Sequence, residues 1–377
     1  MSIFQLWASR LRQSTLAIFV ASVVLTIVFG CLPTFSQTAT TTLTATPSQT
    51  LTPTTRNKFL WPFSPTSPWN MPIGSDALYV PANIQKAGYA GADEEYLMWL
   101  KDGDPLRQLY QPGAWGEGRC TGTQLVGIAP LPIPDDYIVA DAQPGNTPNS
   151  ASAFLLPDGR TLVQIEPLAR CQAGGPLYGF HYYVDEDIYG DGIGGSHFGS
   201  GLSAIGGSIR KGELTSHQPI HHALKVEIWG EKYLYYSADI PGYRWPAELA
   251  DSNAANQYNG NNPALVEGSL LAIPPSVTEE SLNLQTRPAK KLFHALQHYG
   301  AYVVDDAGWD SHYFAVEKGV VEEFSNTFGY DFQGSSGDFY EDFMKLFQAL
   351  NIVDNNGPTS VGGGGTPRAP LAPPIGN

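Results

Sequence analysis

The sequence predicts a mainly β domain, an antiparallel sandwich or jelly roll with a few C-terminal helices, and an α+β fold is the alternative. Three observations predict it. Several stretches alternate apolar and polar residues with period two, and 40 glycines and 30 prolines suit many turns between short strands. Only two stretches, both near the C-terminus, show helical periodicity. Since no Ser- or Pro-rich break divides residues 57–354, we expect one domain there.

The first 31 residues are typical of a secretory signal peptide. Arg10 and Arg12 precede an uncharged apolar run over residues 16–29, which ends at Gly30 and Cys31. This ending resembles the lipobox at which bacterial lipoproteins are cleaved and acylated on the cysteine. We therefore expect an extracytoplasmic protein that is anchored to a membrane through a lipid on Cys31. Plain secretion and an uncleaved N-terminal anchor are the alternatives.

Two compositionally biased segments flank the predicted domain. Residues 32–56 are dominated by Thr, Ser, Pro, Ala and Gln, and they bury too little apolar surface to offset the entropy of ordering. We interpret them as a disordered stalk. Residues 355–377 are rich in Gly and Pro and predict a coil that is either disordered or laid over the domain.

The cysteine content fits an oxidising compartment. If Cys31 carries a lipid, only Cys120 and Cys171 remain, and an even pair in an exported protein indicates a disulfide. Two buried, unpaired thiols are the alternative.

Alternating patterns place the strands. Residues 161–166 and 223–229 alternate with period two, and residues 232–236 follow the second stretch after a Gly-Glu turn, which predicts a hairpin. Residues 301–305 and 312–316, joined by a loop with Asp and Gly, predict another hairpin.

Two helices are expected in the C-terminal part. Residues 289–299 follow Pro288 and stop at Gly300, which are typical start and stop signals. A second amphipathic helix, over residues 339–350, is marked by Phe339, Phe343, Phe347 and Leu350.

The charge balance excludes one class of partner. The chain has 36 acidic and 21 basic residues, for a net charge of −15. Proteins that bind nucleic acid concentrate Lys and Arg, so we expect no nucleic acid partner.

Four motifs carry a resemblance. They are SPWNMPIG at residues 67–74, GSGLSAIGGSIRKGE at residues 199–213, HALK at residues 222–225 and RWPA at residues 244–247. Together they resemble a family of uncharacterised secreted bacterial proteins. The resemblance implies an exported domain and assigns no catalytic residue.

The chain contains no Gly-x-Ser-x-Gly elbow, zinc-protease helix, Walker loop or dinucleotide fingerprint. The densest polar segment runs from residue 164 to residue 229. A β-elimination on a uronic-acid polysaccharide needs a cation to neutralise the carboxylate and a base to take the C5 proton. The candidate catalytic residues are therefore His197, His221, Arg170 and Arg210, and the candidate substrate-binding residues are Trp229, Lys225, Gln164 and Glu166.

The strand that begins at His221 offers the best sugar cleft. Lys225 and Trp229 share its polar face with His221, so the indole could stack on a sugar ring while the cations meet charge. The commoner interpretation of a His-His pair at a strand start is a solvated or hydrogen-bonded corner. The glycines of residues 199–212 permit close backbone approach, which suits either a loop at a binding cleft or a tightly packed turn.

A glycosidase would instead use two carboxylates, for which Glu166, Glu227, Asp191 and Asp305 are available. Calcium is a candidate cofactor because residues 185–192 and 305–310 place carboxylates in Gly-containing loops, although neither has EF-hand spacing.

A zinc pair at His294 and His298 is the weaker hypothesis, since Lys290 and Lys291 lie beside it and favour a solvated face. We assign no metal ligand from the sequence.

These observations predict an extracytoplasmic protein that acts on a polysaccharide, with lyase chemistry ahead of hydrolase chemistry. The alternative is a non-catalytic module that binds carbohydrate or another component of the cell envelope. Convergence of His197, His221, Arg170 and Arg210 in one groove would favour the enzyme, and dispersal would favour the binding module.

Overall fold

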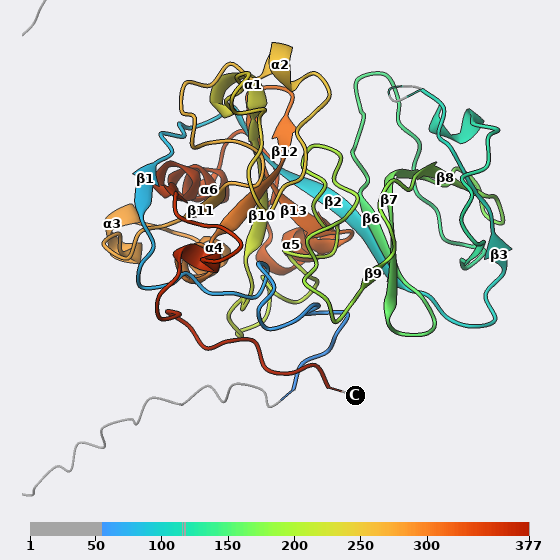
Figure 1. Ribbon diagram of the computed structural model, residues 1–377, viewed down its shortest axis with the longest axis horizontal. Coiled ribbons are helices and arrows are strands. Elements are labelled where there is room, and N and C mark those ends of the chain that lie inside the picture. The colour runs from blue at the N-terminus through green and yellow to red at the C-terminus, as the bar shows by residue number, and fades with distance from the viewer. Residues whose placement is uncertain (1–54, 115, 117, 377) are drawn as a thin grey trace, which may run out of the picture. The chain divides into compact units, whose positions relative to one another are not determined.

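The computed structural model describes residues 55–114, 116 and 118–376 (Figure 1). Contacts divide the chain into residues 1–51 and 52–377, and the described residues belong to the second unit. The predicted signal peptide, Cys31 and the stalk up to residue 54 lie outside the described residues. No helix among the described residues is both long enough and apolar enough to span a membrane.

The described residues form one large sheet with helices against it. Strand content is 26% and helix content is 16%, so the predicted mainly β class with a few C-terminal helices is confirmed. In spatial order the strands are β1 (Tyr79–Pro81), β14 (Asn351–Val353), β11 (Leu270–Ala272), β12 (Ala301–Ala307), β10 (Leu224–Trp229), β13 (Ser311–Glu317), β2 (Tyr89–Trp99), β6 (Ser152–Leu155), β7 (Thr161–Ala169), β8 (Leu177–Phe180) and β4 (Leu109–Tyr110). Strand β9 (Glu186–Asp187) pairs with β7, while β3 (Leu106–Arg107) and β5 (Leu131–Pro132) form a separate pair.

The pairing is mixed, which differs from the antiparallel pairing that we expected. Four pairs are parallel, namely β10 with β12, β13 with β2, β2 with β6, and β4 with β8. Both predicted hairpins are also replaced. Residues 232–236 form no strand, because α1 (Gly230–Tyr233) follows β10. Strands β12 and β13 exist as predicted, but β10 lies between them and pairs with each.

The helices gather on one face of the sheet. Predicted helices 289–299 and 339–350 are present as α4 (Arg287–His298) and α6 (Asp338–Ala349). Three further helices, which we did not predict, are α5 (Val320–Phe328) and the short α2 (Ala254–Gln257) and α3 (Glu279–Leu282). Two 3₁₀ turns are η1 (Arg119–Thr121) and η2 (Val361–Gly363). Apolar residues of β10, such as Leu224 and Val226, pack with Phe343 of α6 in this core.

The opposite face of the sheet is covered by irregular chain and not by helices. Trp69, Leu202 and Ile205 pack there with Tyr302 of β12. The covering segment 194–212 is tied down by its backbone, since the N–H of Ile209 donates to the carbonyl oxygen of Ala315 at 3.1 Å. Both faces of β10 are therefore buried.

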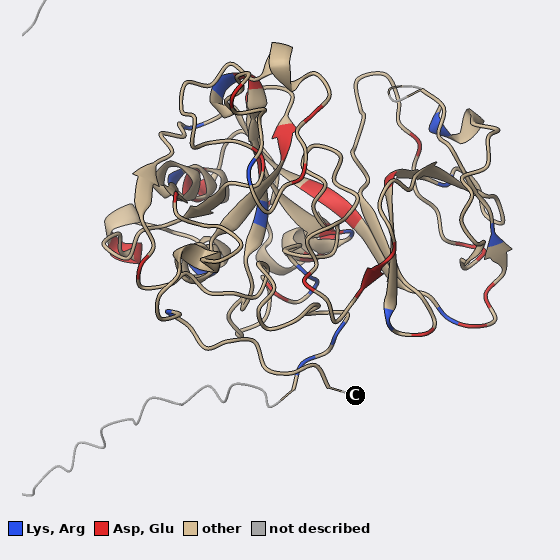
Figure 2. Cartoon of the chain, viewed as in Figure 1, with Lys and Arg blue, Asp and Glu red and all other residues tan. Residues whose placement is uncertain are grey.

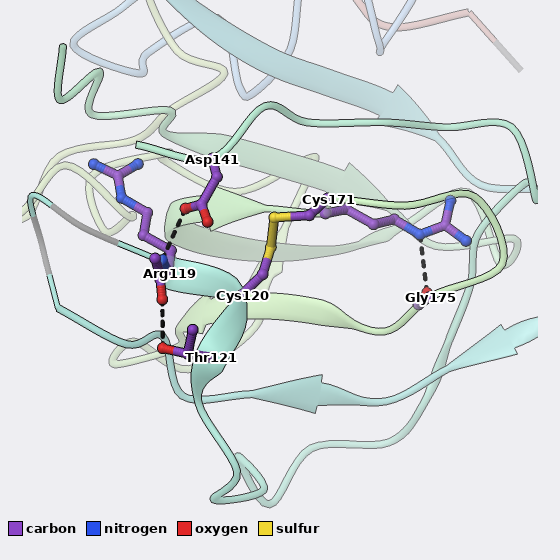
Figure 3. Close-up of a disulfide and its surroundings, with 8 residues drawn as sticks. Arg119, Cys120, Thr121, Asp141, Cys171 and Gly175 are labelled. Atoms are coloured by element: carbon purple, nitrogen blue, oxygen red, sulfur yellow. Dashed lines mark hydrogen bonds between the residues drawn. A yellow bond between two sulfur atoms is a disulfide. The ribbon is translucent and has the colours of Figure 1, made fainter. Parts of the chain in front are cut away.

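A third core cluster lies under β7 and β8 and contains Phe154, Ile165 and Leu177. Beside it, Cys120 and Cys171 form a disulfide with a Cα–Cα distance of 6.3 Å, which confirms the predicted bridge (Figure 3). The backbone N–H of Arg119 donates to Asp141 at 2.8 Å next to this bridge.

The C-terminal segment, residues 355–376, is laid over the domain, which is one of the two states that we predicted for it. The backbone N–H of Arg56 donates to Pro374 at 3.1 Å, and its Nε–H donates to the carbonyl oxygen of Pro373 at 2.7 Å. Arg56 is only 5% exposed. The predicted stalk boundary after residue 56 is therefore wrong, because this guanidinium is part of the folded domain.

Candidate functional site

Side chains of four strands and one loop build a buried polar layer under segment 194–212. We call this layer the charged face. It comprises Asp93 and Glu95 of β2, Gln164 and Glu166 of β7, Lys225 and Glu227 of β10, Asp305 of β12, and His197 of the covering segment. Each of these side chains is at most 8% exposed. Figure 2 shows the acidic segments on β2 and β12 and the basic one on β10.

Glu95 is the centre of a fully paired part of this layer. Its Oε1 accepts from Nε2 of His197 at 2.6 Å and from the ammonium of Lys225, and its Oε2 accepts from the hydroxyl of Ser208. Burial alone would raise the pKa of Glu95, but the charges of Lys225 and His197 and their hydrogen bonds outweigh burial and lower it. This carboxylate is held ionised.

The other carboxyl groups of the charged face lack such compensation. Burial first, and then neighbouring carboxylates, raise the pKa of Asp93 to about 7 and raise the pKa values of Glu166, Glu227 and Asp305 well above the usual range. Among the described residues, Oε1 of Glu166 is a buried oxygen without a hydrogen-bond partner, while the carboxyl groups of Asp93 and Glu227 hydrogen-bond each other. Such strongly perturbed groups mark a candidate functional site.

Glycines let the covering segment approach this layer. A Cβ on Gly199 would lie 2.3 Å from Oδ1 of Asp305. Gly207 has a φ of +76°, and a Cβ there would lie 2.9 Å from Cγ of Lys225. The glycines therefore serve a tightly packed cover, which is the second of the two interpretations that the sequence had left open.

Two adjoining pockets open elsewhere on the surface. The histidine pocket, of about 440 Å³, contains His217, His221, His294, His298, Lys291 and Arg368 among its lining residues. The arginine pocket, of about 340 Å³, contains Arg56, Trp61, Arg210, Lys211, Glu213, His221 and His222 among its lining residues. Pro219 and His221 line both pockets.

The imidazole of His221 is positioned between these pockets. Its ring stacks on Trp61 with centroids 5.6 Å apart. Burial, and then the charge of His222, lower the pKa of His221, so this imidazole is neutral near pH 7. Burial, and then Arg287, also lower the pKa of Lys291 to about 8.

The four predicted catalytic residues do not converge in one groove. His197 lies in the charged face, whereas His221 and Arg210 line the arginine pocket. Arg170 is fully buried near the disulfide, where its guanidinium donates to the carbonyl oxygens of Pro134 and Gly175.

Three of the four predicted substrate-binding residues, Gln164, Glu166 and Lys225, are buried, and Trp229 is half-buried. Lys225 and Trp229 alternate with the apolar side chains of β10 as expected, but Lys225 is fully buried under segment 194–212. The expectation of an open sugar cleft on this face is therefore wrong. Gln164 holds the cover in place, since its Oε1 accepts from the N–H of Ala204 at 2.8 Å, and Glu166 accepts from the N–H of Phe198 at 2.9 Å.

Among the described residues, two groups outside the disulfide could hold a metal ion, namely Glu166 with His197 and Asp305, and Asp251 with Asp305 and Asp306. Of the predicted calcium loops, 305–310 contributes two residues to these groups and 185–192 contributes none. Neither His294 nor His298 belongs to such a group.

Sequence reasoning missed Asp93 and Glu95, which lie in the longest strand of the sheet. Their stretch reads YAGADEEYLMW, in which small and acidic residues replace the apolar alternation that marks a strand. It also missed Arg368, since the C-terminal segment has the composition of a coil. The excess of adjacent carboxylates at residues 93–95 was the only signal available.

No family model, no curated protein and no solved structure matched this chain.

Proposed function

We propose that this protein binds an acidic, uronate-containing polysaccharide outside the cytoplasm, along the histidine and arginine pockets. One observation carries the proposal: cationic and imidazole side chains are concentrated in two adjoining pockets of a chain with 36 acidic and 21 basic residues. Within the part of the chain that the structure describes, no Asp or Glu lines the histidine pocket, and Glu213 is the one acidic residue that lines the arginine pocket.

The pocket chemistry suits carboxylated sugars. Arg368 donates to the hydroxyl of Tyr79 at 3.3 Å and is half-buried, so its guanidinium is oriented and still reachable by a carboxylate. Trp61 supplies an aromatic surface beside His221. Cations in an otherwise acidic surface focus an anionic ligand toward one place.

The test is a titration with polygalacturonate and with dextran as the neutral polymer. Arg368→Ala should weaken polygalacturonate binding about tenfold or more, because it removes a charged hydrogen-bond donor worth about 1.5–3 kcal/mol. Arg160→Ala is the matched control, since Arg160 is an exposed arginine paired with Asp187 on another part of the sheet.

Binding should also weaken as salt is raised, because salt screens charge pairs at a protein surface. Equal affinity for dextran and polygalacturonate, or equal effects of the two arginine variants, would reject the proposal.

β-Elimination in the same pockets is a second candidate, favoured by the lowered pKa of His221. A neutral imidazole could take the C5 proton while Lys291 or Arg368 neutralises the carboxylate. The C5–H electrons would form the C4–C5 double bond, the C4–O bond would break, and the leaving oxygen would take a proton from water. Ultraviolet absorbance from the unsaturated product would reveal this reaction, and His221→Ala should abolish it while binding remains.

A further inference from the structure

The charged face contains three converging ligand atoms, and two of the three residues, Glu166 and His197, have a buried polar atom without a hydrogen-bond partner. The ligand atoms belong to Glu166, His197 and Asp305, and they lie within 4.8 Å of one another. The three side chains are 0%, 0% and 7% exposed. We propose that Glu166, His197 and Asp305 bind a divalent transition metal, with Zn²⁺ as the best-fitting ion.

The hydrogen bonds of His197 fix which ring nitrogen is available. Nε2 lies 2.6 Å from the ionised carboxylate of Glu95 and 3.2 Å from Nζ of Lys225, and we assign the proton to Nε2 because the contact with the carboxylate is the shorter one. In the neutral ring Nδ1 then carries a lone pair, and Nδ1 is buried without a hydrogen-bond partner. A carboxylate that orients a histidine through one nitrogen while the other nitrogen binds metal is the usual outer-shell arrangement.

The two carboxylates are oriented in a similar way. Glu166 uses Oε2 to accept from the N–H of Phe198 at 2.9 Å, while its Oε1 is buried and unpartnered. Asp305 accepts from the amide of Asn149 at 2.8 Å through Oδ2 and from the N–H of Asp306 at 2.9 Å through Oδ1. Glu166 is thus held through one oxygen, whereas both oxygens of Asp305 accept one hydrogen bond each and keep a second lone pair for a cation.

Charge points to a cation as the missing partner. The charged face contains one ammonium group, that of Lys225, and five carboxyl groups, those of Asp93, Glu95, Glu166, Glu227 and Asp305. Buried carboxylates are normally paired or bound to metal, because removing an ion from water costs several kcal/mol. Lys225 is already committed to Glu95 and to the carbonyl oxygens of Ser203 and Ala204.

The donor set selects the class of ion. Imidazole nitrogen with two carboxylates suits Zn²⁺, whereas Ca²⁺ and Mg²⁺ prefer oxygen ligands alone. A tetrahedral Zn²⁺ with bonds of about 2.0–2.1 Å needs ligand atoms about 3.3 Å apart, so small side-chain shifts would close the site. The second group, Asp251 with Asp305 and Asp306, has only oxygen donors and shares Asp305 with the first.

The experiment measures metal binding in the absence of polysaccharide. A negative result would therefore reject the metal site without bearing on the proposed binding of polysaccharide. Protein stripped with a chelator is titrated with Zn²⁺, Mn²⁺ and Ca²⁺ by calorimetry, and metal content is measured by mass spectrometry. We expect one Zn²⁺ per chain, a higher melting temperature with Zn²⁺, and weaker binding of Mn²⁺ and Ca²⁺. No stoichiometric metal, or tightest binding of Ca²⁺, would overturn the proposal.

Glu166→Gln is the informative variant, because glutamine keeps the shape and an acceptor for Phe198 while it removes the charge. Zn²⁺ affinity should fall at least about 100-fold, whereas the melting temperature of the metal-free protein should stay equal or rise. Glu267→Gln is the control, since Glu267 is also fully buried with an unpartnered oxygen but lies outside the triad. Equal loss in both variants would overturn the assignment.

Discussion

Nε2 of His197 lies 2.6 Å from Oε1 of Glu95, and neither side chain is exposed to solvent. The first residue belongs to the covering segment and the second to β2, so this contact joins the cover to the centre of the sheet. Lys225 completes the group from β10. The buried ammonium group of Lys225 therefore stabilises both the covering segment and β2.

Removal of the Lys225 ammonium should be strongly destabilising. We expect Lys225→Met to lower the free energy of unfolding by about 3–5 kcal/mol, because Glu95 would keep a buried charge without its cation. Urea denaturation checks this. The control is Lys290→Met, which breaks the more exposed 3.1 Å pair with Glu279 and should cost about 1 kcal/mol or less. Similar losses in the two variants would contradict the role given to Lys225.

Arg56 should matter for stability although the sequence places it in the stalk. A chain that starts at Thr55 should unfold at nearly the same urea concentration as the full chain, because residues before it have the composition of a stalk. Replacement of Arg56 by Ala should cost about 2 kcal/mol or more, since its buried guanidinium donates to the carbonyl oxygens of Pro62 and Pro373. A neutral effect would mean that the terminal segment does not depend on this residue.

The disulfide should stabilise the part of the sheet around β7 and β8. Replacement of both Cys120 and Cys171 by Ser should lower the free energy of unfolding by about 4 kcal/mol, as the chain-entropy argument gives for a loop of this length. Reductant should destabilise the wild-type protein by a similar amount and should leave the double variant unchanged. If reductant also destabilised the double variant, the stability lost by the wild-type protein could not be assigned to the disulfide.

Buried His312 should make the protein sensitive to mild acid. Burial lowers the pKa of this imidazole to about 4, against the opposing effects of the Gln85 carbonyl and of Asp310, and Lys232 lowers it further. In the unfolded chain His312 is therefore protonated near pH 6.5, whereas in the folded chain it is protonated only near pH 4. This contribution to stability is present above the unfolded pKa and is lost as the pH falls through that window.

The loss is up to about 3 kcal/mol, since each pKa unit corresponds to about 1.4 kcal/mol. Stability curves of wild type and His312→Phe between pH 7 and pH 4 measure it. Phe fits because His312 already stacks on Phe347 with centroids 4.9 Å apart. The curve of the variant should be flatter, and parallel curves would assign the acid sensitivity to other groups.

Gly199→Ala should disturb the charged face, because the added Cβ would lie 2.3 Å from Oδ1 of Asp305. We expect a loss of about 1–3 kcal/mol by thermal unfolding. Gly308→Ala is the control, as a Cβ there meets nothing within 4 Å, and its effect should stay within about 0.5 kcal/mol. Equal effects would show that the cover adapts to added volume.

Local sequence patterns predicted those strands in which apolar and polar residues alternate, and the helix α4 with clear start and stop residues. The alternation in residues 161–166 and 223–229, and the start and stop signals around α4, correspond to elements of the structure. Such local patterns could not predict the order of the strands in the sheet. Strand β2 pairs with β13, whose partner residues lie more than two hundred positions away, as in the pair of Ala90 with His312. No local turn signal reports such parallel pairing.

The polar face of β10 shows why the site was harder to predict than the strand. Alternation correctly put Lys225 and Glu227 on one side, but the sequence could not say that residues 194–212 would cover that side. Polar alternation normally marks a solvated face, and here it marks a buried ionic layer. Arg210 and His221 do line the arginine pocket together. Lys291 and Arg368 join His221 in the histidine pocket, and only the tertiary fold brings these three residues together.

The strand order also bears on when the domain can form during synthesis. The sheet needs β13, which ends at Glu317, to connect β10 with β2. Until that late strand is made, the chain from Tyr89 onward has two separate half-sheets with unpaired edges. Folding is therefore a late, nearly post-synthetic event with many distant contacts, and such topologies fold slowly. A nascent chain of this kind cannot complete its central sheet before Glu317 has been added.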